Sequence, residues 1–355
     1  MATPAPRLPV TVVTGFLGAG KSTLLRQLLL TSGLRLAVLV NEFGEVGIDG
    51  DLIRSCRVCP DDAQIDEPTP VVELANGCLC CTVQDEFLPT MQVLLERADH
   101  LDGIVVETSG LALPVPLVQA FQWPEIRTRT RVSGVVTVVD GEALAQGSVV
   151  GDPAALEAQR LADPSLDHLS DLEGLFHDQL QAADLVLLSR ADRLSAEQLQ
   201  ALQGDLTPKL RPGVSVVPMV RGQVPAALLL GLDRQPEALH VHGHDHDHDH
   251  HHDHSHVAMQ SAVLSWNGPV DRSRLEPLLQ RLIARHQLLR LKGKAWLPGK
   301  PHPLQIQAVG PRLECWFDPV RRSGADPEQG LQLVALGLDV PGEALQLQLD
   351  QALMA

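Results

Sequence analysis

The residues best suited to chemistry lie near the start of the chain, in the run Gly15-Phe16-Leu17-Gly18-Ala19-Gly20-Lys21-Ser22. Glycines at this spacing let backbone N–H groups turn inward around phosphate oxygens, and a helix that begins at Lys21 adds its positive dipole end. Lys21 is suited to reach the β- and γ-phosphates of a nucleotide, and Ser22 to offer its hydroxyl to Mg²⁺. A glycine-rich turn without a ligand is the alternative, but a strand before the run and a helix after it favour a phosphate-binding loop. The expected nucleotide contacts are Gly15, Gly18, Ala19, Gly20, Lys21, Ser22 and Thr23, with Lys21 also acting in catalysis.

A second group, Glu107-Thr108-Ser109-Gly110, directly follows the apolar run Ile104-Val105-Val106. In phosphate-loop enzymes an acidic residue at such a strand end holds Mg²⁺ through water, and a nearby glycine senses the γ-phosphate. We therefore expect Glu107 to act in catalysis and to share Mg²⁺ with Ser22, and we expect Gly110 to contact the nucleotide. The alternative is a strand-end carboxylate that only caps the next turn.

A third group, Ser189-Arg190-Ala191-Asp192, follows the apolar run Val186-Leu187-Leu188. An aspartate here suits guanine, because one carboxylate can accept hydrogen bonds from both the N1–H and the 2-amino group of that base. Ser189, Arg190 and Asp192 are therefore expected to bind the base of the nucleotide. Four residues alone do not define such a site.

Three thiols, Cys78, Cys80 and Cys81, stand close together in the chain. Thiolates this dense repel one another unless they are protonated or bound to a metal. Three soft ligands suit Zn²⁺, Co²⁺ or Cu⁺ in a roughly tetrahedral site with one open position. Buried core cysteines or a redox thiol are the alternative. The pair Cys56 and Cys59 is only half of such a site, and we interpret it as part of a loop without this function.

Residues 240–256, HVHGHDHDHDHHHDHSH, contain ten of the chain's 15 histidines and four aspartates. Neutral imidazoles at this density bind divalent metals weakly and without selectivity. A low-complexity spacer that binds nothing is the alternative. In either case the composition predicts a solvated linker between two domains.

The composition excludes several classes of protein. With 28 Lys and Arg against 44 Asp and Glu, the formal net charge is −16, which argues against nucleic-acid binding and is compatible with cationic ligands. Six cysteines in 355 residues, most of them clustered, indicate reduced thiols in a cytosol rather than a disulfide scaffold. No apolar run approaches the roughly 18 residues of a membrane span, and the N-terminus lacks a secretory pattern. We therefore expect a cytoplasmic protein without nucleic-acid or membrane partners.

Short apolar runs alternate with helical patterns up to about residue 222, which predicts an α/β fold with a phosphate-loop domain around a doubly wound, mostly parallel sheet. Its expected strands are 10–13, 36–40, 103–106, 134–139 and 184–188, with a helix over 21–30. The C-terminal part predicts a smaller α+β domain, in which two helices cover one face of a mostly antiparallel sheet. Its strands are expected at about 261–266, 289–297, 303–309, 313–317 and 331–335, and its helices at 272–287 and from 341. The expected domains are 1–225 and 260–355, with a His/Asp-rich linker over 226–259.

Together these motifs resemble the CobW family of metal-chaperone GTPases, which belongs to the SIMIBI class of phosphate-loop proteins. The resemblance runs nearly end to end and is carried by Gly15–Thr23, Asn41-Glu42-Phe43-Gly44, Gly77–Cys81, Glu107–Gly110 and Gly310-Pro311-Arg312. It implies hydrolysis of GTP with Mg²⁺, and a divalent ion held by the three clustered thiols. The family's guanine motif usually reads Asn-Lys-x-Asp, so Ser189 and Arg190 depart from it while Asp192 matches.

Three segments are most similar to the cobalamin-biosynthesis branch of this family: Val46-Gly47-Ile48-Asp49-Gly50, Leu88-Pro89-Thr90-Met91 and Leu175–Asp184. That similarity implies that the ion is Co²⁺ and that the receiving partner is the corrin-ring chelatase, a cobaltochelatase. Thiolates bind Zn²⁺ more tightly than Co²⁺, so the site alone does not select cobalt. A Zn²⁺ chaperone of the same family stays open, as does a metal-storage protein in which GTP hydrolysis is incidental.

The segment from Asn41 to Cys81 lies in the chain between the phosphate loop and Glu107, where the γ-phosphate-sensing switches of this class of enzyme lie. GTP is therefore expected to bring the thiols into ligating geometry, and hydrolysis to release the metal to a partner. Glu42 is the acidic residue expected at the switch, where it either orients the attacking water or completes the metal shell. A small-molecule kinase is a further alternative, but it would need a lid, for which we find no pattern.

Overall fold

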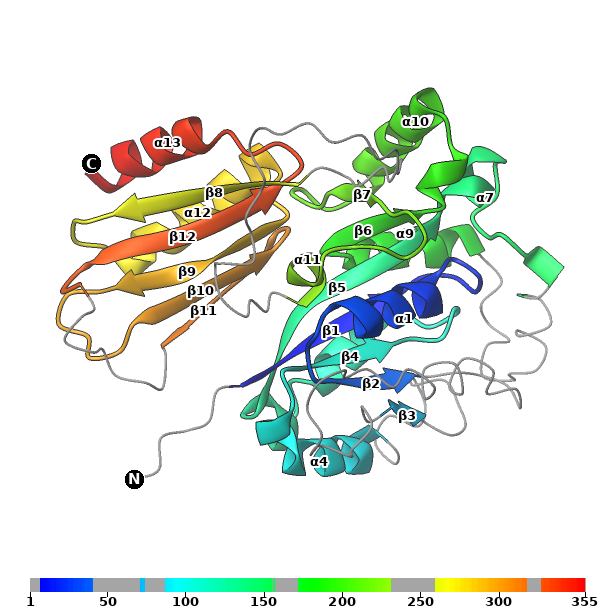
Figure 1. Cartoon of the computed structure of the whole chain (residues 1–355), viewed down its shortest axis with the longest axis horizontal. Helices are drawn as coiled ribbons and strands as arrows, with labels where there is room; N and C mark the ends of the chain where they lie inside the picture. Colours follow the sequence, from blue (N-terminus) through cyan, green and yellow to red (C-terminus); the bar gives the residue numbers. More distant parts are fainter. Residues whose placement is uncertain are drawn as a thin grey trace, which may run out of the picture.

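The computed structural model of the chain describes residues 7–40, 87–154, 156, 172–230, 259–317 and 327–354, together with the backbone of 71–73. Within these residues the chain forms one parallel and one antiparallel sheet, each packed against helices (Figure 1). The predicted class, an α/β fold with a smaller α+β domain, is confirmed.

The larger sheet has the strand order β3-β2-β4-β1-β5-β6-β7, and every neighbouring pair is parallel. Its strands are β1 (Leu8–Thr14), β2 (Leu36–Val40), β3 (Val71–Glu73), β4 (Gly103–Glu107), β5 (Thr130–Asp140), β6 (Leu185–Ser189) and β7 (Val216–Pro218). The strands β1, β2, β4 and β6 are buried along their whole length. Burial on both faces explains why these strands read as apolar runs without polar alternation.

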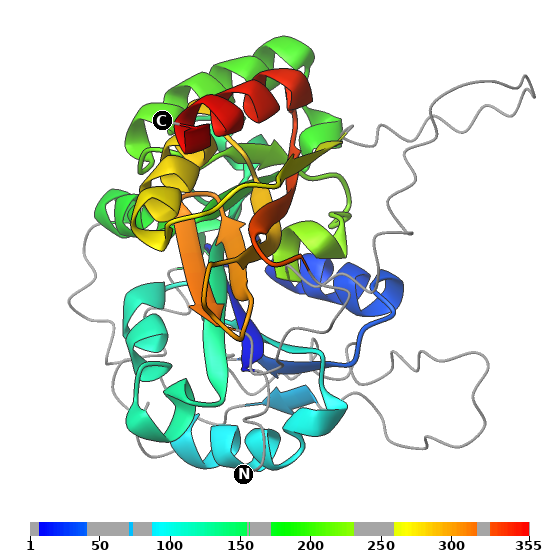
Figure 2. The ribbon, with the colours of Figure 1, turned by 90° about the vertical axis from the view of Figure 1, so that its left-hand side faces the viewer.

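Helices cover both faces of this sheet. Val13 of β1 points into a core shared with helices α1 and α11, whereas Val12 points into a core shared with α4, α5 and α6. Figure 2 shows the blue helix α1 on one side of the strands and the teal helices of residues 114–127 on the other. The helices of this domain are α1 (Lys21–Thr31), α4 (Leu88–Glu96), α5 (Pro114–Ala120), α6 (Pro124–Arg127), α7 (Gly141–Ala145), α9 (Leu172–Ala182), α10 (Ala196–Leu206) and α11 (Ala226–Leu230).

The strand order decides which loops meet. β1 lies between β4 and β5, and β6 follows β5. Because all these strands are parallel, the loops after β1, β4, β5 and β6 leave the sheet at the same edge. These loops carry the phosphate-loop run, Glu107–Gly110 and Ser189–Asp192.

The smaller sheet is antiparallel and has the order β11-β10-β9-β12-β8. Its strands are β8 (Gln260–Trp266), β9 (Arg290–Trp296), β10 (Leu304–Val309), β11 (Arg312–Phe317) and β12 (Gly330–Gly337). Helices α12 (Arg272–His286) and α13 (Gly342–Met354) share one apolar core with one face of this sheet. The prediction of two helices on one face of a small antiparallel sheet is confirmed.

The two sheets are packed against each other through an apolar contact. Leu289 and Val309 of the smaller domain belong to the same buried core as Leu228 of α11. Gly310, which follows β10, has a φ of 47°, and a Cβ there would lie 2.1 Å from the carbonyl oxygen of Asp184. The connection between β10 and β11 therefore needs glycine where it meets the first domain.

Two expectations differ from the structure. The linker was expected to begin at 226, but Ala226–Leu230 form helix α11, and Leu228, Leu229 and Leu230 are buried in the core of the parallel sheet. β5 begins at Thr130 instead of 134, because polar Arg131 and Ser133 interrupt its apolar pattern without ending the strand. The rest of the expected linker, 231–258, lies outside the described residues. Among the helices that are described, none has the length and apolar character needed to cross a bilayer.

Candidate nucleotide site

The phosphate-loop run forms the connection between β1 and α1. Gly15, Gly18 and Gly20 have φ values of 135°, 75° and 105°, in the region that favours glycine. A Cβ on Gly15 would also lie 2.1 Å from the carbonyl oxygen of Val138 in β5. Gly20 is the N-cap of α1, so the first N–H groups of this helix face the loop and can bind an anion. The predicted start of the helix at Lys21 is confirmed.

The side chain of Lys21 lies inside this loop. Lys21 is buried, and its Nζ donates hydrogen bonds to the carbonyl oxygens of Gly15 at 2.9 Å and Phe16 at 3.1 Å. The same Nζ is 3.9 Å from Oε1 of Glu107. Phosphate oxygens are stronger acceptors for an ammonium group than neutral carbonyls, so Lys21 can exchange these contacts for a phosphate.

Glu107 is the last residue of β4 and lies beside the phosphate loop. β4 pairs with β1 so that Glu107 stands beside Val13, next to the start of the phosphate loop. Ser22 Oγ donates to Glu107 Oε1 at 3.5 Å, at the long limit for a hydrogen bond. A hydroxyl and a carboxylate are hard oxygen ligands of the kind that Mg²⁺ prefers. The donor set therefore fits Mg²⁺ beside the phosphate loop.

Gly110 packs directly against the phosphate loop. A Cβ at this position would lie 2.6 Å from the backbone nitrogen of Leu17, a distance that would force the two segments apart. The segment is tied to β1 at its start, where Thr108 Oγ1 donates to Thr14 Oγ1 at 2.9 Å. A shift of Gly110 toward the phosphate loop would therefore displace the backbone of that loop at Leu17.

The expected base-binding residues lie at the carboxyl end of β6, beside the same loop. Ser189 is buried, and its Cβ would be 3.6 Å from a Cβ placed on Gly20. Asp192 lies in the first turn of the short 3₁₀ helix Ala191–Arg193 and is exposed. Its carboxylate is thus accessible to a ligand at this edge of the sheet.

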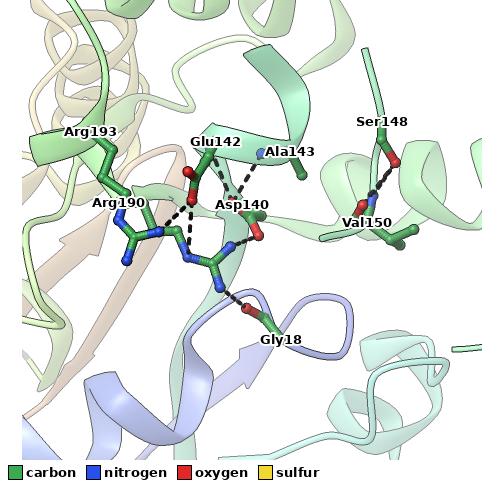
Figure 3. A network of polar contacts seen from close by, with 8 residues as sticks. All are labelled: Gly18, Asp140, Glu142, Ala143, Ser148, Val150, Arg190 and Arg193. Atoms are coloured by element: carbon green, nitrogen blue, oxygen red, sulfur yellow. Dashed lines mark hydrogen bonds and ion pairs between the residues drawn. The ribbon is translucent and has the colours of Figure 1, made fainter. Parts of the chain in front are cut away.

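Arg190 connects this segment to the phosphate loop. It has a left-handed φ of 54°. Its Nη2 donates to the carbonyl oxygen of Gly18 at 3.1 Å, and its Nη1 donates to the carboxylate of Asp140 (Figure 3). Asp140 is the last residue of β5, and it is buried.

Three residues at this edge are absent from the predicted site. Asp140 follows an apolar run, as Glu107 does, and that shared position is a signal that could have found it. Gln179 of α9 is fully buried and donates from Nε2 to the carbonyl oxygens of Ala112 at 3.2 Å and Gly110 at 3.4 Å. Gly222, in the loop after β7, approaches α1 so closely that a Cβ would lie 2.7 Å from the carbonyl oxygen of Thr23.

The expected metal ligands Cys78, Cys80, Cys81 and Glu42 lie outside the described residues, as do Cys56 and Cys59. Within the part of the chain that the structure describes, no group of three or more His, Cys, Asp or Glu side chains could hold a metal ion. The described thiol, Cys315, is half-buried in β11, and burial raises its pKa to about 12. The thiol cluster therefore stays a prediction from the sequence.

Two family models match the chain along most of its length. The model described as the CobW/HypB/UreG nucleotide-binding domain matches residues 9–218, which include the whole candidate site. The model described as the cobalamin synthesis protein CobW C-terminal domain matches residues 259–353.

Individual proteins show the same similarity. A Pseudomonas aeruginosa protein named zinc chaperone CobW is 47% identical over 98% of this chain and 92% of its own length. A Sinorhizobium protein of the same name is 43% identical over 95% of both chains. Among solved structures, Zn(II)-bound YjiA GTPase from E. coli is 24% identical and covers 98% of this chain and 99% of its own, with a TM-score of 0.41.

Proposed function

Because the chain belongs to the CobW family, whose nucleotide-binding and C-terminal domains it contains in order, we propose that it is a GTP-hydrolysing metallochaperone. The observation that carries the proposal is the meeting of Lys21, Ser22 and Glu107 at one glycine-rich loop. These side chains supply the ammonium, hydroxyl and carboxylate groups that a magnesium nucleotide requires.

In the proposed reaction, water attacks the γ-phosphorus of GTP while the bond from this phosphorus to the β,γ-bridging oxygen breaks, giving GDP and phosphate. Lys21 leaves the carbonyls of Gly15 and Phe16 and stabilises the negative charge that develops on the phosphate oxygens. Ser22 and Glu107 would hold Mg²⁺, which would supply positive charge to neutralise the phosphates. Glu42 is proposed either to orient the attacking water or to complete the metal shell.

Guanine is the proposed base. Asp192 is exposed beside the phosphate loop, and a carboxylate there can accept hydrogen bonds from both the N1–H and the 2-amino group of guanine. Adenine has neither of these donors. Arg190 replaces the lysine that the family motif usually has, and its guanidinium contacts the loop at Gly18. The departure from the usual motif at Ser189 and Arg190 is therefore compatible with guanine binding.

The proposed cargo is Zn²⁺, held by Cys78, Cys80 and Cys81. The two similar proteins described above are named zinc chaperones, and thiolates bind Zn²⁺ more tightly than Co²⁺. These comparisons support the zinc alternative better than the expected cobalt role. The proposed receiver is an enzyme that requires the ion; it would be the cobaltochelatase only if the cargo were Co²⁺. Residues 240–256 are proposed to store further ions weakly, because flexible ligands lose entropy when they are ordered.

Nucleotide and cargo are proposed to be coupled. The thiols lie in the chain between the phosphate loop and Glu107, so the γ-phosphate can order the segment that carries them. Coupling of this kind is reciprocal: if GTP tightens metal binding by some factor, the metal must tighten GTP binding by the same factor. Hydrolysis then lowers the affinity for the ion and releases it.

The test is phosphate release from GTP and ATP, measured with Mg²⁺ alone and with added Zn²⁺ or Co²⁺. We expect hydrolysis of GTP but not of ATP, a change in rate on adding the cargo ion, and loss of hydrolysis in Lys21→Ala. A protein that only buffers metal would bind the ions without hydrolysing GTP. Hydrolysis that no cargo ion alters would leave a GTPase and refute the chaperone role.

A further inference from the structure

We propose that Asp140 is a positioning residue of the nucleotide site, which holds the guanidinium of Arg190 across the gap between β5 and the phosphate loop. The inference deepens the proposed function and rests on it, because it concerns how the guanine nucleotide is held. The ion pair between Asp140 and Arg190 is proposed to contribute part of the affinity for the nucleotide. This pair links three separate elements: the ends of β5 and β6, and the phosphate loop (Figure 3).

Asp140 is held in place on both of its oxygens. It is 2% exposed, and its Oδ1 accepts hydrogen bonds from the backbone N–H groups of Glu142 at 3.1 Å and Ala143 at 3.2 Å. These contacts make Asp140 the N-cap of α7 and orient Oδ2 toward Arg190. The backbone at Gly151 packs directly against this carboxylate: a Cβ at that position would lie 2.6 Å from Oδ2. A buried carboxylate that is oriented in advance in this way pays little entropy when it binds a cation.

Arg190 uses the two ends of its guanidinium for different partners. Nη1 donates to Asp140, and Nη2 donates to the carbonyl oxygen of Gly18 at 3.1 Å. Ser189 cannot replace this link, since its Oγ is buried without a hydrogen-bond partner among the described residues. Asp140 thus fixes one end of a planar group, and the other end is directed at the loop that binds phosphate.

This arrangement predicts that arginine and lysine are not equivalent at position 190, although the family motif usually has lysine there. Lysine is one bond shorter, so its Nζ would end near the position of the arginine Cζ, about 1.3 Å short of each terminal nitrogen. A single ammonium at that point could still pair with Asp140 but would lie beyond hydrogen-bond reach of the Gly18 carbonyl oxygen, so one of the two contacts would be lost. Restoring the commoner residue in Arg190→Lys should therefore weaken nucleotide binding.

The experiment is a double-mutant cycle on the full chain, with the dissociation constants of GDP and GTP measured in Mg²⁺ without cargo metal. Asp140→Asn keeps the cap of α7, because asparagine is as good an N-cap as aspartate, and replaces the Oδ2 acceptor of Arg190 with an uncharged amide nitrogen that cannot accept. We expect it to weaken both nucleotides about five- to tenfold, with a similar loss in Arg190→Ala and a smaller one in Arg190→Lys. In the Arg190→Ala background, Asp140→Asn should change binding by less than about twofold, because its effect passes through Arg190.

Glu142→Gln is the matched control. Glu142 is also a carboxylate at this edge, but its short pair is with Arg193 at 2.7 Å, and its ion pair with the Nε of Arg190 is long, at 3.9 Å. It is expected to bind nucleotide within about twofold of the unmodified chain. The melting temperature of nucleotide-free Asp140→Asn should stay within about 2 °C, which separates positioning from folding.

Three results would overturn the inference. Unchanged affinity in Asp140→Asn would show that the carboxylate does not position Arg190. An equal loss with and without Arg190 would show that Asp140 acts through the fold. If the unmodified chain bound neither GDP nor GTP, the proposed function and this inference would fail together. If the unmodified chain bound nucleotide tightly and Asp140→Asn bound it equally well, only the inference would fail.

Discussion

The guanidinium of Arg312 in β11 is ion-paired with the carboxylate of Asp184, with Nε 2.5 Å from Oδ2. Asp184 directly precedes β6 and is 0% exposed. Its other oxygen accepts from Nη2 of Arg211 at 2.7 Å, and the backbone N–H of Val135 donates to Oδ2 at 2.9 Å. One buried carboxylate therefore joins the antiparallel sheet to the amino end of the parallel sheet, opposite the edge that carries the nucleotide site.

Removing this carboxylate should destabilise the junction of the two domains. In Asp184→Ala, Arg211 and Arg312 lose their shared partner, and only part of each side chain is exposed to water, 38% and 26%. Breaking a buried pair by removing one partner costs roughly 3 kcal/mol or more, less where the remaining charges can reach solvent. We expect the free energy of unfolding to fall by about 2–3 kcal/mol, measured by denaturant titration.

The control for that measurement is Glu276→Gln. Glu276 pairs with Arg272 one turn away on α12, and both side chains reach solvent, with 36% and 44% of their surface exposed. Exposed pairs at this spacing contribute about 0.3–0.5 kcal/mol. A loss in Asp184→Ala no greater than this would contradict the assignment of Asp184 as the link between the domains.

Glu107→Gln should separate magnesium binding from nucleotide binding. The amide keeps the size of the side chain beside Ser22 and Lys21 but removes its charge. We expect the GTPase rate to fall at least about 100-fold and the Mg²⁺ concentration for half-maximal rate to rise, because the donor set loses its anion. Steady-state phosphate release over a Mg²⁺ series gives both values. An unchanged Mg²⁺ requirement would mean that Glu107 only caps the turn after β4.

Gly110→Ala tests the close approach of this segment to the phosphate loop. The new Cβ would lie 2.6 Å from the backbone nitrogen of Leu17, so the loop or the segment must move. We expect GTP affinity to fall at least about tenfold. Gly204→Ala in α10 is the matched control, because a Cβ there meets nothing within 4 Å and alanine favours a helix by up to about 1 kcal/mol. Equal GTP affinity in the two variants would contradict the proposed contact.

The elements around the site could be predicted because their signals are local. Residues 36–40 form an apolar run and are β2 in the structure, and the helix after the glycine-rich turn starts at Lys21 as expected. Helix α11 was missed because five residues, Ala226–Leu230, are too few to show helical periodicity next to a tract of such unusual composition. Its burial depends on Leu289 and Val309, which come from the other domain.

The polar contacts behind the site could not be predicted, because they join residues far apart in the chain. The amide of Gln179 reaches Gly110, and Arg312 reaches Asp184, across 69 and 128 positions. Neither glutamine nor arginine has a local pattern that distinguishes these roles from an ordinary surface position. The phosphate loop itself was predictable, since its glycines, lysine and hydroxyl are consecutive.

Asp192→Asn should relax the choice between GTP and ATP. The proposed carboxylate accepts two hydrogen bonds from guanine, and each charge-assisted bond contributes roughly 1.5–3 kcal/mol. We expect GTP affinity to fall about 10- to 100-fold while ATP affinity changes little, as measured by competition with labelled GDP. Asp205→Asn, an exposed aspartate on α10, is the control. If the unmodified chain bound ATP as tightly as GTP, guanine selection would be refuted before any variant was made.

The last prediction concerns the thiols, with Co²⁺ used as a spectroscopic probe for the metal site. Co²⁺–thiolate charge-transfer absorption should appear with GTP and Mg²⁺ and be weak with GDP, because the γ-phosphate orders the segment that carries Cys78, Cys80 and Cys81. Zn²⁺ should displace the probe, since thiolates prefer it. Cys80→Ser should abolish the band.

Cys315→Ser is the matched control for Cys80→Ser. Cys315 lies in β11 of the C-terminal domain, far in the chain from the three clustered thiols, and burial raises its pKa to about 12, which disfavours the thiolate form. The band should therefore survive in Cys315→Ser, and deletion of residues 240–256 should remove weakly held ions but leave the band. Equal bands with GTP and GDP would refute nucleotide control of the metal. A band lost in Cys315→Ser but kept in Cys80→Ser would place the metal in the C-terminal domain, and a band lost with residues 240–256 would place it in the linker.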